Sequence, residues 1–249
     1  MSYDLIVLSP HLDDAALSCG GAIHRATAAG RRVLVINVFT GDPPRDAELS
    51  PLARELHEAW QLGDDPLTIR RQEDERAMAI LGAEARNWPL PDALYRTAAD
   101  GRPLYSDLDR IFAPPEAEDA ELEHDLARRL LELPRAATVL APLAAGNHVD
   151  HWLVRRAALR ALAPERIWQY EDFPYARSRR VLSRAFGRRH DWSRRVEPLS
   201  DEDVQARIDA IACYESQLGT AFKDRAQLER RVRRYVRRRG GERFWRRVR

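Results

Sequence analysis

Short runs of apolar, mostly branched residues alternate along the 249-residue chain with longer segments whose apolar positions recur at helical spacing. The short runs predict strands at residues 5–8, 32–39, 85–90, 138–141 and 166–170. The longer segments predict helices near residues 15–29, 50–61, 68–81, 118–131, 149–161 and 201–217. Strands that alternate with helices are typical of crossover connections. The pattern therefore predicts an α/β fold with a Rossmann-like, mostly parallel sheet and helices on both faces.

Breakers and caps define the ends of several elements. We expect Gly30 to end the first helix, and Ser50 with Pro51 to begin the second as cap and first-turn proline. Residues 92–118 and 174–195 lack a periodic pattern and are expected to be irregular. Because no internal repeat or linker interrupts the chain, we expect a single domain over residues 1–249.

The composition narrows the class of protein. Apolar residues make up 44% of the chain, which is enough to bury a core, and no apolar run approaches the ~18 residues of a membrane helix. The N-terminal sequence lacks the basic flank and cleavage site of a secretory signal. Two cysteines are too few for a disulfide framework. We therefore expect a cytoplasmic protein without a membrane span.

Charge is distributed unevenly along the sequence. The net charge is +2, but residues 223–249 hold 13 basic and three acidic side chains, a net of +10 that leaves −8 on the remainder. We expect this arginine-rich segment to dock on the acidic body of the molecule. The alternative is a binding protein whose arginine-rich tail binds nucleic acid or an anionic membrane.

Two polar segments follow predicted strands. The sequence PHLDD (10–14) follows the first strand and HVDH (148–151) follows the fourth. Ligands in doubly wound sheets bind beyond the carboxyl ends of strands, at the point where the strand order reverses. We expect the two segments to meet there, with three histidines and three aspartates around one crevice. Burying so many polar groups is costly unless a metal satisfies them.

The spacing within these segments suggests which residues bind the metal. His11 and Asp14 are three residues apart, as are His148 and His151, so the members of each pair share one face if each segment enters a helical turn. Two histidines, one carboxylate and an open water position fit catalytic zinc. We therefore take His11, Asp14 and His151 as the ligands of Zn²⁺, and Fe²⁺ or another divalent metal remains an alternative.

Three neighbouring residues are candidates for catalysis. Asp13 lies next to a ligand but points to a different side, so it can act as the base for the attacking water. His148 lies near the start of a helix, where an oxyanion is stabilised, and Asn147 is the expected cap of that helix. Asp150 is expected to orient and charge His148.

The segments LSPHLDDAALSCGG and GNHVDH resemble the paired motifs of the PIG-L/LmbE-like de-N-acetylases, which act on N-acetylglucosaminyl conjugates. The resemblance extends over RRQEDERAMAILG (70–82), LPD (90–92) and RIDAIACYESQ (207–217). It implies the same roles for the metal ligands, the base and the oxyanion-stabilising histidine. It also implies that Arg70 and Asp92 bind substrate. The commoner family motif, HPDDE, has a proline where this chain has Leu12 and an acid where it has Ala15.

The resemblance predicts a zinc-dependent hydrolase that removes the acetyl group of a small-molecule amino-sugar conjugate, without nucleic acid as a partner; a homo-oligomer stays open. Alternatives are an amidase acting on a non-sugar or thiol conjugate, a binding protein with a vestigial metal site, and a non-haem Fe(II) oxygenase. For Arg70 the alternative is an exposed ion pair with Glu73 or Asp74. The pair Gly20-Gly21 is expected to allow close helix–sheet packing, and Asp172 is a candidate substrate contact.

Overall fold

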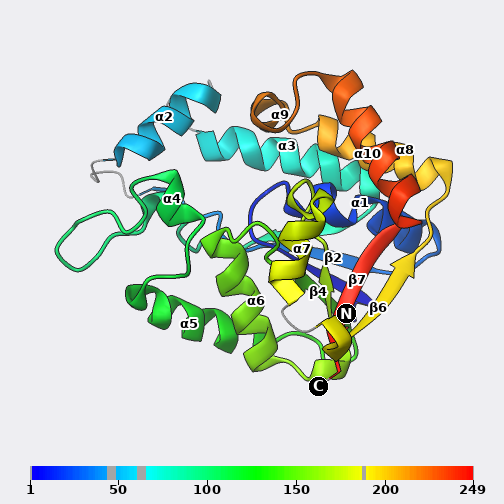
Figure 1. The fold of residues 1–249 in the computed structure, drawn as a ribbon, viewed down its shortest axis with the longest axis horizontal. Helices are drawn as coiled ribbons and strands as arrows, with labels where there is room; N and C mark the ends of the chain where they lie inside the picture. Colours follow the sequence, from blue (N-terminus) through cyan, green and yellow to red (C-terminus); the bar gives the residue numbers. More distant parts are fainter. Residues whose placement is uncertain (1, 44–48, 61–65, 187–188, 249) are drawn as a thin grey trace.

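A computed structural model describes residues 2–43, 49–60, 66–186 and 189–248. Its centre is a seven-stranded sheet in the order β3-β2-β1-β4-β5-β7-β6 (Figure 1). Strands β1 to β5 are parallel, and β7 pairs antiparallel with both β5 and β6. The strands are β1 (Leu5–Ser9), β2 (Val33–Asn37), β3 (Glu84–Asn87), β4 (Thr138–Pro142), β5 (Ile167–Tyr170), β6 (Trp192–Glu197) and β7 (Glu242–Arg247). The prediction of a mostly parallel α/β sheet is confirmed.

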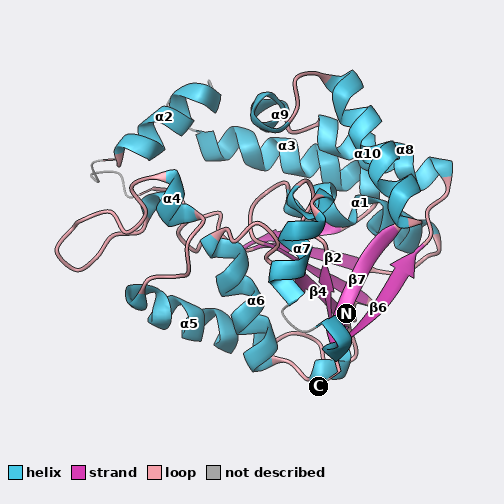
Figure 2. Cartoon of the chain, viewed as in Figure 1, coloured by secondary structure: helices cyan, strands magenta, loops and turns pink. Residues whose placement is uncertain are grey.

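Helices cover both faces of this sheet (Figure 2). They are α1 (Asp14–Ala28), α2 (Pro51–Trp60), α3 (Pro66–Leu81), α4 (Leu108–Ile111), α5 (Ala120–Leu131), α6 (Val149–Ala161), α7 (Arg179–Phe186), α8 (Asp201–Ala212), α9 (Glu215–Ala221) and α10 (Arg225–Arg239). Alternate residues of β1 face opposite ways, as the strand period requires. Leu5 and Val7 pack in one core with α1, α3 and α8, while Ile6 and Leu8 pack in the other with α5 and α6. In the described part of the chain, no helix is both long and apolar enough to cross a membrane.

The predicted helix boundaries hold where a cap or breaker marks them. Gly30 has φ +77° just beyond α1, and the Ser50 hydroxyl accepts a hydrogen bond from the backbone N–H of Ala53 at 3.1 Å. Two predictions are wrong. The stretch 174–195, expected to be irregular, contains α7 and the start of β6. The single helix expected over 201–217 is two helices, because α8 ends at Ala212 and α9 begins at Glu215.

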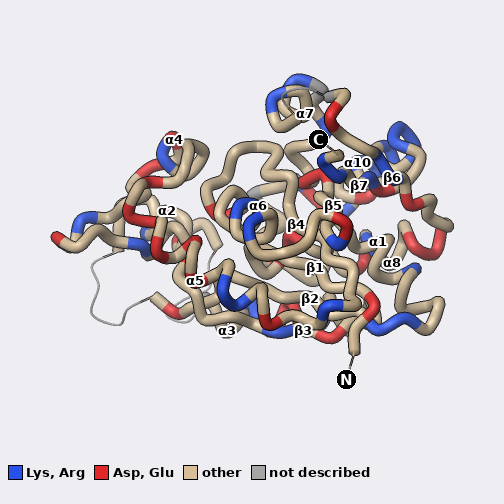
Figure 3. Tube along the Cα trace, turned by 90° about the horizontal axis from the view of Figure 1, so that it is seen from below, with Lys and Arg blue, Asp and Glu red and all other residues tan. Residues whose placement is uncertain are grey.

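The arginine-rich segment is part of the folded body. Its strand β7 lies within the sheet, between β5 and β6, and blue arginine-rich stretches gather at α7, α10 and β6 in Figure 3. The Tyr235 hydroxyl and the Trp245 indole N–H both donate to the buried carboxylate of Glu171, at 2.7 and 3.0 Å. The expectation that the segment docks on the body is confirmed, and a freely extended basic tail is excluded for the described residues.

A buried ion pair from later parts of the chain holds α1. Glu242, at the start of β7, accepts hydrogen bonds from the backbone N–H groups of Gly21 (3.0 Å) and Ala22 (2.8 Å). Arg207 of α8 donates to the backbone carbonyl of Leu17, and its guanidinium lies 3.1 Å from the Glu242 carboxylate. Both charged side chains are almost completely buried. Arginine and glutamate thus bind backbone groups in the middle of α1, directly behind the PHLDD segment.

The glycine pair makes this close approach feasible. A Cβ atom at Gly20 would lie 3.0 Å from Cγ of Arg207. At Gly21 it would lie 3.1 Å from a Glu242 oxygen and 2.4 Å from a methyl group of Leu199. The glycine pair does allow a close approach, but the predicted partner, the sheet, is corrected: the nearest atoms belong to the side chains of Arg207, Glu242 and Leu199.

Removing one partner of this pair should destabilise the fold strongly. We expect Arg207→Met to lower the free energy of unfolding by about 3–5 kcal/mol, because Glu242 is left buried without a counter-charge. The matched control is Arg225→Met, which removes an exposed ion pair with Asp209 and should cost about 1 kcal/mol or less. Urea unfolding followed by circular dichroism measures both. Equal, small losses of unfolding free energy in both variants would show that the buried pair stabilises the fold no more than the exposed pair does.

Candidate active site

The two polar segments meet at the carboxyl edge of the sheet. Strands β1 and β4 are hydrogen-bonded neighbours, and the loops that follow them lead into α1 and α6. The chain leaves β1 toward β2 on one side and β4 toward β5 on the other, so the strand order reverses at this point. A cavity of about 620 Å³ opens there. Its wall includes the polar residues His11, Asp13, Asp14, Arg70, Asp92, His148 and His151.

The three predicted metal ligands converge on one another. His11 Nδ1 lies 3.1 Å and His151 Nε2 lies 3.2 Å from the same carboxylate oxygen, Oδ2 of Asp14. One donor atom from each of these residues lies within 4.8 Å of the others. The arrangement is that of two imidazoles and a carboxylate facing one point, as in catalytic sites that keep an open position.

Each of the two histidines is fixed from behind by a second carboxylate. His11 Nε2 lies 2.9 Å from Asp150, and His151 Nδ1 lies 2.7 Å from Asp172. Both carboxylates are fully buried. Metal-binding histidines typically donate their other ring N–H to such a group, which fixes the tautomer. Asp172, a candidate substrate contact by its position after β5, instead lies behind His151.

These residues fit a divalent cation. Burial alone would lower the pKa of His151, but the nearby carboxylates of Asp14 and Asp172 outweigh it and raise that pKa to about 10. Burial would likewise raise the pKa of Asp14, yet the two histidines hold it well below its usual value. The carboxylates thus favour positive charge between them. A second group of potential ligands, His11, His148 and Asp150, fits less well because Asp150 is already bound by an arginine.

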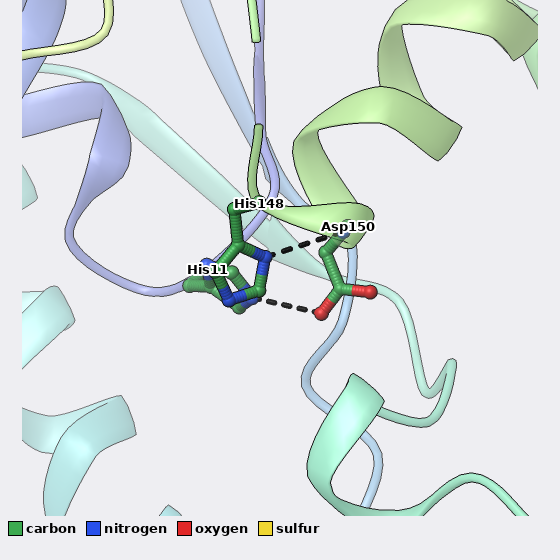
Figure 4. Close-up of side chains that lie close together, drawn as sticks. All are labelled: His11, His148 and Asp150. Atoms are coloured by element: carbon green, nitrogen blue, oxygen red, sulfur yellow. Dashed lines mark hydrogen bonds and ion pairs between the residues drawn. The ribbon is translucent and has the colours of Figure 1, made fainter. Parts of the chain in front are cut away.

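Asp150 does not play the expected part toward His148. Its carboxylate contacts His11 and also accepts a hydrogen bond from Arg96 at 2.6 Å, whereas only its backbone N–H reaches His148 (Figure 4). Arg96 in turn pairs with the buried Asp119 at 3.0 Å. The prediction that the Asp150 carboxylate orients His148 is therefore corrected: the side chain holds His11, and the backbone holds His148.

His148 is placed as a neutral hydrogen-bond donor. It caps α6, because its Nδ1 accepts the backbone N–H of Asp150 at 3.2 Å, so the expected cap Asn147 is wrong. Asn147 instead has a left-handed backbone with φ +67°. Burial, and then the nearby charge of His11, hold the pKa of His148 well below its usual value. An imidazole that is neutral and accepts at Nδ1 carries its proton on Nε2.

Asp13 lies at the start of α1, next to the predicted ligand Asp14. It occupies the cap position of α1 but its side chain makes no capping hydrogen bond, and it lines the cavity. Burial, followed by repulsion from Asp14, raises the pKa of Asp13, while the Arg70 guanidinium opposes the rise. A carboxylate with a raised pKa beside a metal-binding cluster is suited to accept and return a proton.

Arg70 and Asp92 lie at the cavity wall, near the predicted ligands. Arg70 is 6% exposed and stacks over Trp60 at 4.9 Å, and its Nε has no hydrogen-bond partner among the described residues. The alternative of an exposed ion pair with Glu73 or Asp74 is therefore wrong; those carboxylates accept hydrogen bonds from other residues. Asp92 Oδ2 lies 3.6 Å from His11 Nε2.

Comparison with known proteins gives consistent results. A family model described as GlcNAc-PI de-N-acetylase (PIG-L) matches residues 6–162. The chain is 33% identical to a 2'-N-acetylparomamine deacetylase of Streptomyces fradiae, over 85% of this chain and 72% of that protein. It is 28% identical to the enzyme of the same name from Niallia circulans, over 88% and 82%. The zinc-inhibited form of teicoplanin deacetylase Orf2 superimposes with a TM-score of 0.77 at 28% identity, covering 97% of each chain.

Proposed function

The chain belongs to the PIG-L family of GlcNAc-PI de-N-acetylases, and from that premise we propose that it removes the acetyl group from the nitrogen of an N-acetylated amino sugar within a larger conjugate. One observation carries the proposal. The cluster of His11, Asp14 and His151 is flanked by an uncommitted carboxylate, Asp13, and by a neutral imidazole donor, His148. The named relatives are deacetylases of amino-sugar conjugates.

We propose zinc as the resident metal, held by His11, Asp14 and His151. Two nitrogen donors, one oxygen donor and second carboxylates behind both imidazoles suit this ion. A zinc ion there would act as a Lewis acid on the acetamide carbonyl and would lower the pKa of water toward neutrality. The domain that presents this site would span residues 1–249, since α8 and β7 hold α1 in place.

Two residues beside the cluster would carry out proton transfer and oxyanion stabilisation. The Asp13 carboxylate takes a proton from the water while the water oxygen attacks the carbonyl carbon of the acetamide. His148 donates a hydrogen bond from its Nε2–H to the carbonyl oxygen while negative charge develops there. It thus serves as an oxyanion hole. The protonated Asp13 then gives its proton to the nitrogen as the C–N bond breaks. The products are acetate and the free amine.

Sugar recognition would come from Arg70 and Asp92. The arginine offers several N–H donors, and the aspartate offers a carboxylate to sugar hydroxyls. We expect Asp92→Ala to reduce kcat/KM for an N-acetylglucosaminide by at least tenfold, since a buried polar partner is lost. Turnover of a simple acetamide should fall much less, because it has no hydroxyls to bind. Steady-state kinetics on both substrates, with metal content measured in parallel, provides the test.

Equal losses of kcat/KM on the sugar and on the acetamide would assign Asp92 to the metal site. The Asp92 carboxylate lies close enough for that role, 3.6 Å from His11 Nε2. The matched control is Asp107→Ala. Asp107 is the exposed N-cap of α4, and its loss should leave kcat/KM unchanged for both the sugar and the acetamide.

The direct test of the proposed function is acetate release from a panel of N-acetylglucosaminides. We expect release by the zinc-loaded chain, loss after chelation and recovery when zinc is restored. Of the alternatives, an Fe(II) oxygenase is disfavoured because such enzymes normally use an antiparallel jelly roll, whereas this sheet is mostly parallel. Oxygen uptake in place of acetate release would reverse that conclusion.

A further inference from the structure

The wall of the cavity changes character away from the metal-binding cluster. The histidines and aspartates of the wall gather at the cluster. The remaining wall is chiefly apolar and aromatic and includes Tyr175, Leu218 and Phe222, with two arginines and a glutamine among its members. A sugar ring carries hydroxyls on most of its carbons, and each needs a polar partner when buried. The apolar part of the wall is therefore suited to the group attached to the sugar rather than to the sugar itself.

The aromatic part of this wall is held in place before any ligand binds. The Tyr175 ring packs against Gly146, where a Cβ atom would lie 2.7 Å from the ring. Phe112 lies edge-on to Tyr175 at 6.1 Å and to His148 at 5.5 Å. A row of rings thus leads outward from the His148 imidazole, and Tyr175 as a residue remains 39% exposed. Such a surface binds a flat apolar group without rearrangement.

Two arginines complete the wall beyond the rings. Arg231 of α10 lies over the ring of Phe222 at 5.6 Å and donates one N–H to the carbonyl of Ala221 at 2.9 Å. Arg177 follows Tyr175 by two residues and lines the same cavity. Burial, and then the charges of Arg231 and Arg234, lower the pKa of Arg177.

These three guanidinium groups lack acidic partners. Among the residues that the structure describes, no carboxylate lies within 4.0 Å of the charged nitrogens of Arg177, Arg231 or Arg234. Other arginines of the same segment are paired, as in Arg233 with Glu229 at 2.8 Å and Arg239 with Glu171 at 3.6 Å. Two of these arginines, Arg177 and Arg231, line the cavity.

We propose that the aglycone of the substrate has a ring-containing apolar portion next to the amino sugar and ends in an anionic group, a carboxylate or a phosphate, that binds Arg177 and Arg231. Guanidinium groups bind both anions through paired N–H donors. The inference rests on the proposed function for the identity of the sugar end. The subsite itself rests only on the aromatic wall and the unpaired arginines.

The test compares three N-acetylglucosaminides that share a biphenyl aglycone and end in a carboxylate, a phosphate or a neutral methyl ester. We expect kcat/KM for at least one anionic substrate to exceed that for the ester roughly tenfold at low salt. The preference should shrink near 0.5 M NaCl because the arginines are partly exposed. The carboxylate and phosphate arms distinguish the two anions.

Two variants and a control locate the effect. Arg231→Gln and Arg177→Gln should each bring the ratio of anionic to ester kcat/KM close to one. Arg230→Gln removes the same charge from the adjacent, exposed position of α10, outside the cavity wall, and should keep the wild-type ratio. A ratio lost equally in all three variants would mean a long-range field without a binding subsite, and would overturn the proposal.

A binding measurement separates this inference from the proposed function. Calorimetry with the sugar-free biphenyl carboxylate should show binding that Arg231→Gln weakens by about tenfold. Acetate release without any preference for the anion would overturn the inference and leave the function standing. Arginine-dependent binding without acetate release from any substrate would support the subsite and contradict the function.

Discussion

Asp13→Asn should reduce kcat by about 10²–10⁴-fold while the bound metal is retained. The amide keeps the size of the carboxylate but cannot take a proton from water. The fold should be unaffected, because the Asp13 side chain makes no capping hydrogen bond at α1. Acetate release and metal content, measured on the same preparation, give the two readouts.

The control for this prediction is Asp42→Asn. Asp42 is exposed, lies after β2 and pairs with Arg71, so the same chemical change there should leave kcat within about twofold. Near-normal turnover in Asp13→Asn would contradict the assignment of Asp13 as the general base. A loss of metal together with activity would instead make Asp13 part of the metal-binding set.

His151→Ala should abolish both metal binding and acetate release. The site then has one histidine and one carboxylate, and Asp172 faces an empty space behind them. Asp172→Asn should have a graded effect, because it leaves the ligand but weakens its support; we expect metal affinity to fall by about 10–100-fold. Metal analysis after dialysis against a graded chelator series measures both variants.

His24→Ala provides the comparison for His151→Ala. His24 also pairs with a carboxylate, Asp203, at 2.8 Å, but it lies on the far part of α1 and outside the cavity. Its loss should leave metal content unchanged. Stoichiometric zinc in His151→Ala would contradict the ligand assignment, and unchanged affinity in Asp172→Asn would contradict the supporting role.

Much of the site could be predicted because it depends on short sequence segments at strand ends. PHLDD and HVDH follow β1 and β4, and the topological rule for parallel sheets brings such ends together. The spacing of His11 and Asp14 then limited which side chains could share a face. The fold class followed from strands and helices whose periodicity is unambiguous.

Other features depend on contacts that no local pattern encodes. The partner of His151 is Asp172, 21 residues later, and the carboxylate of Asp150 reaches back 139 residues to His11. Strand β7 was missed because its sequence, ERFWRR, places charged residues around a buried Phe244 and Trp245. Arginine-rich composition obscures the alternation that would have marked an antiparallel strand.

The ion pair behind α1 has a consequence for how the protein is made. Glu242 follows Gly21 by 221 residues, so α1 leaves the ribosome long before the strand that accepts its N–H groups. Until β7 is synthesised, the edge of β5 also lacks its antiparallel neighbour. A nascent or prematurely terminated chain would expose an apolar strand edge and an unsupported catalytic helix, which are features that promote aggregation and chaperone binding. Support of the catalytic helix is thereby tied to the synthesis of β7.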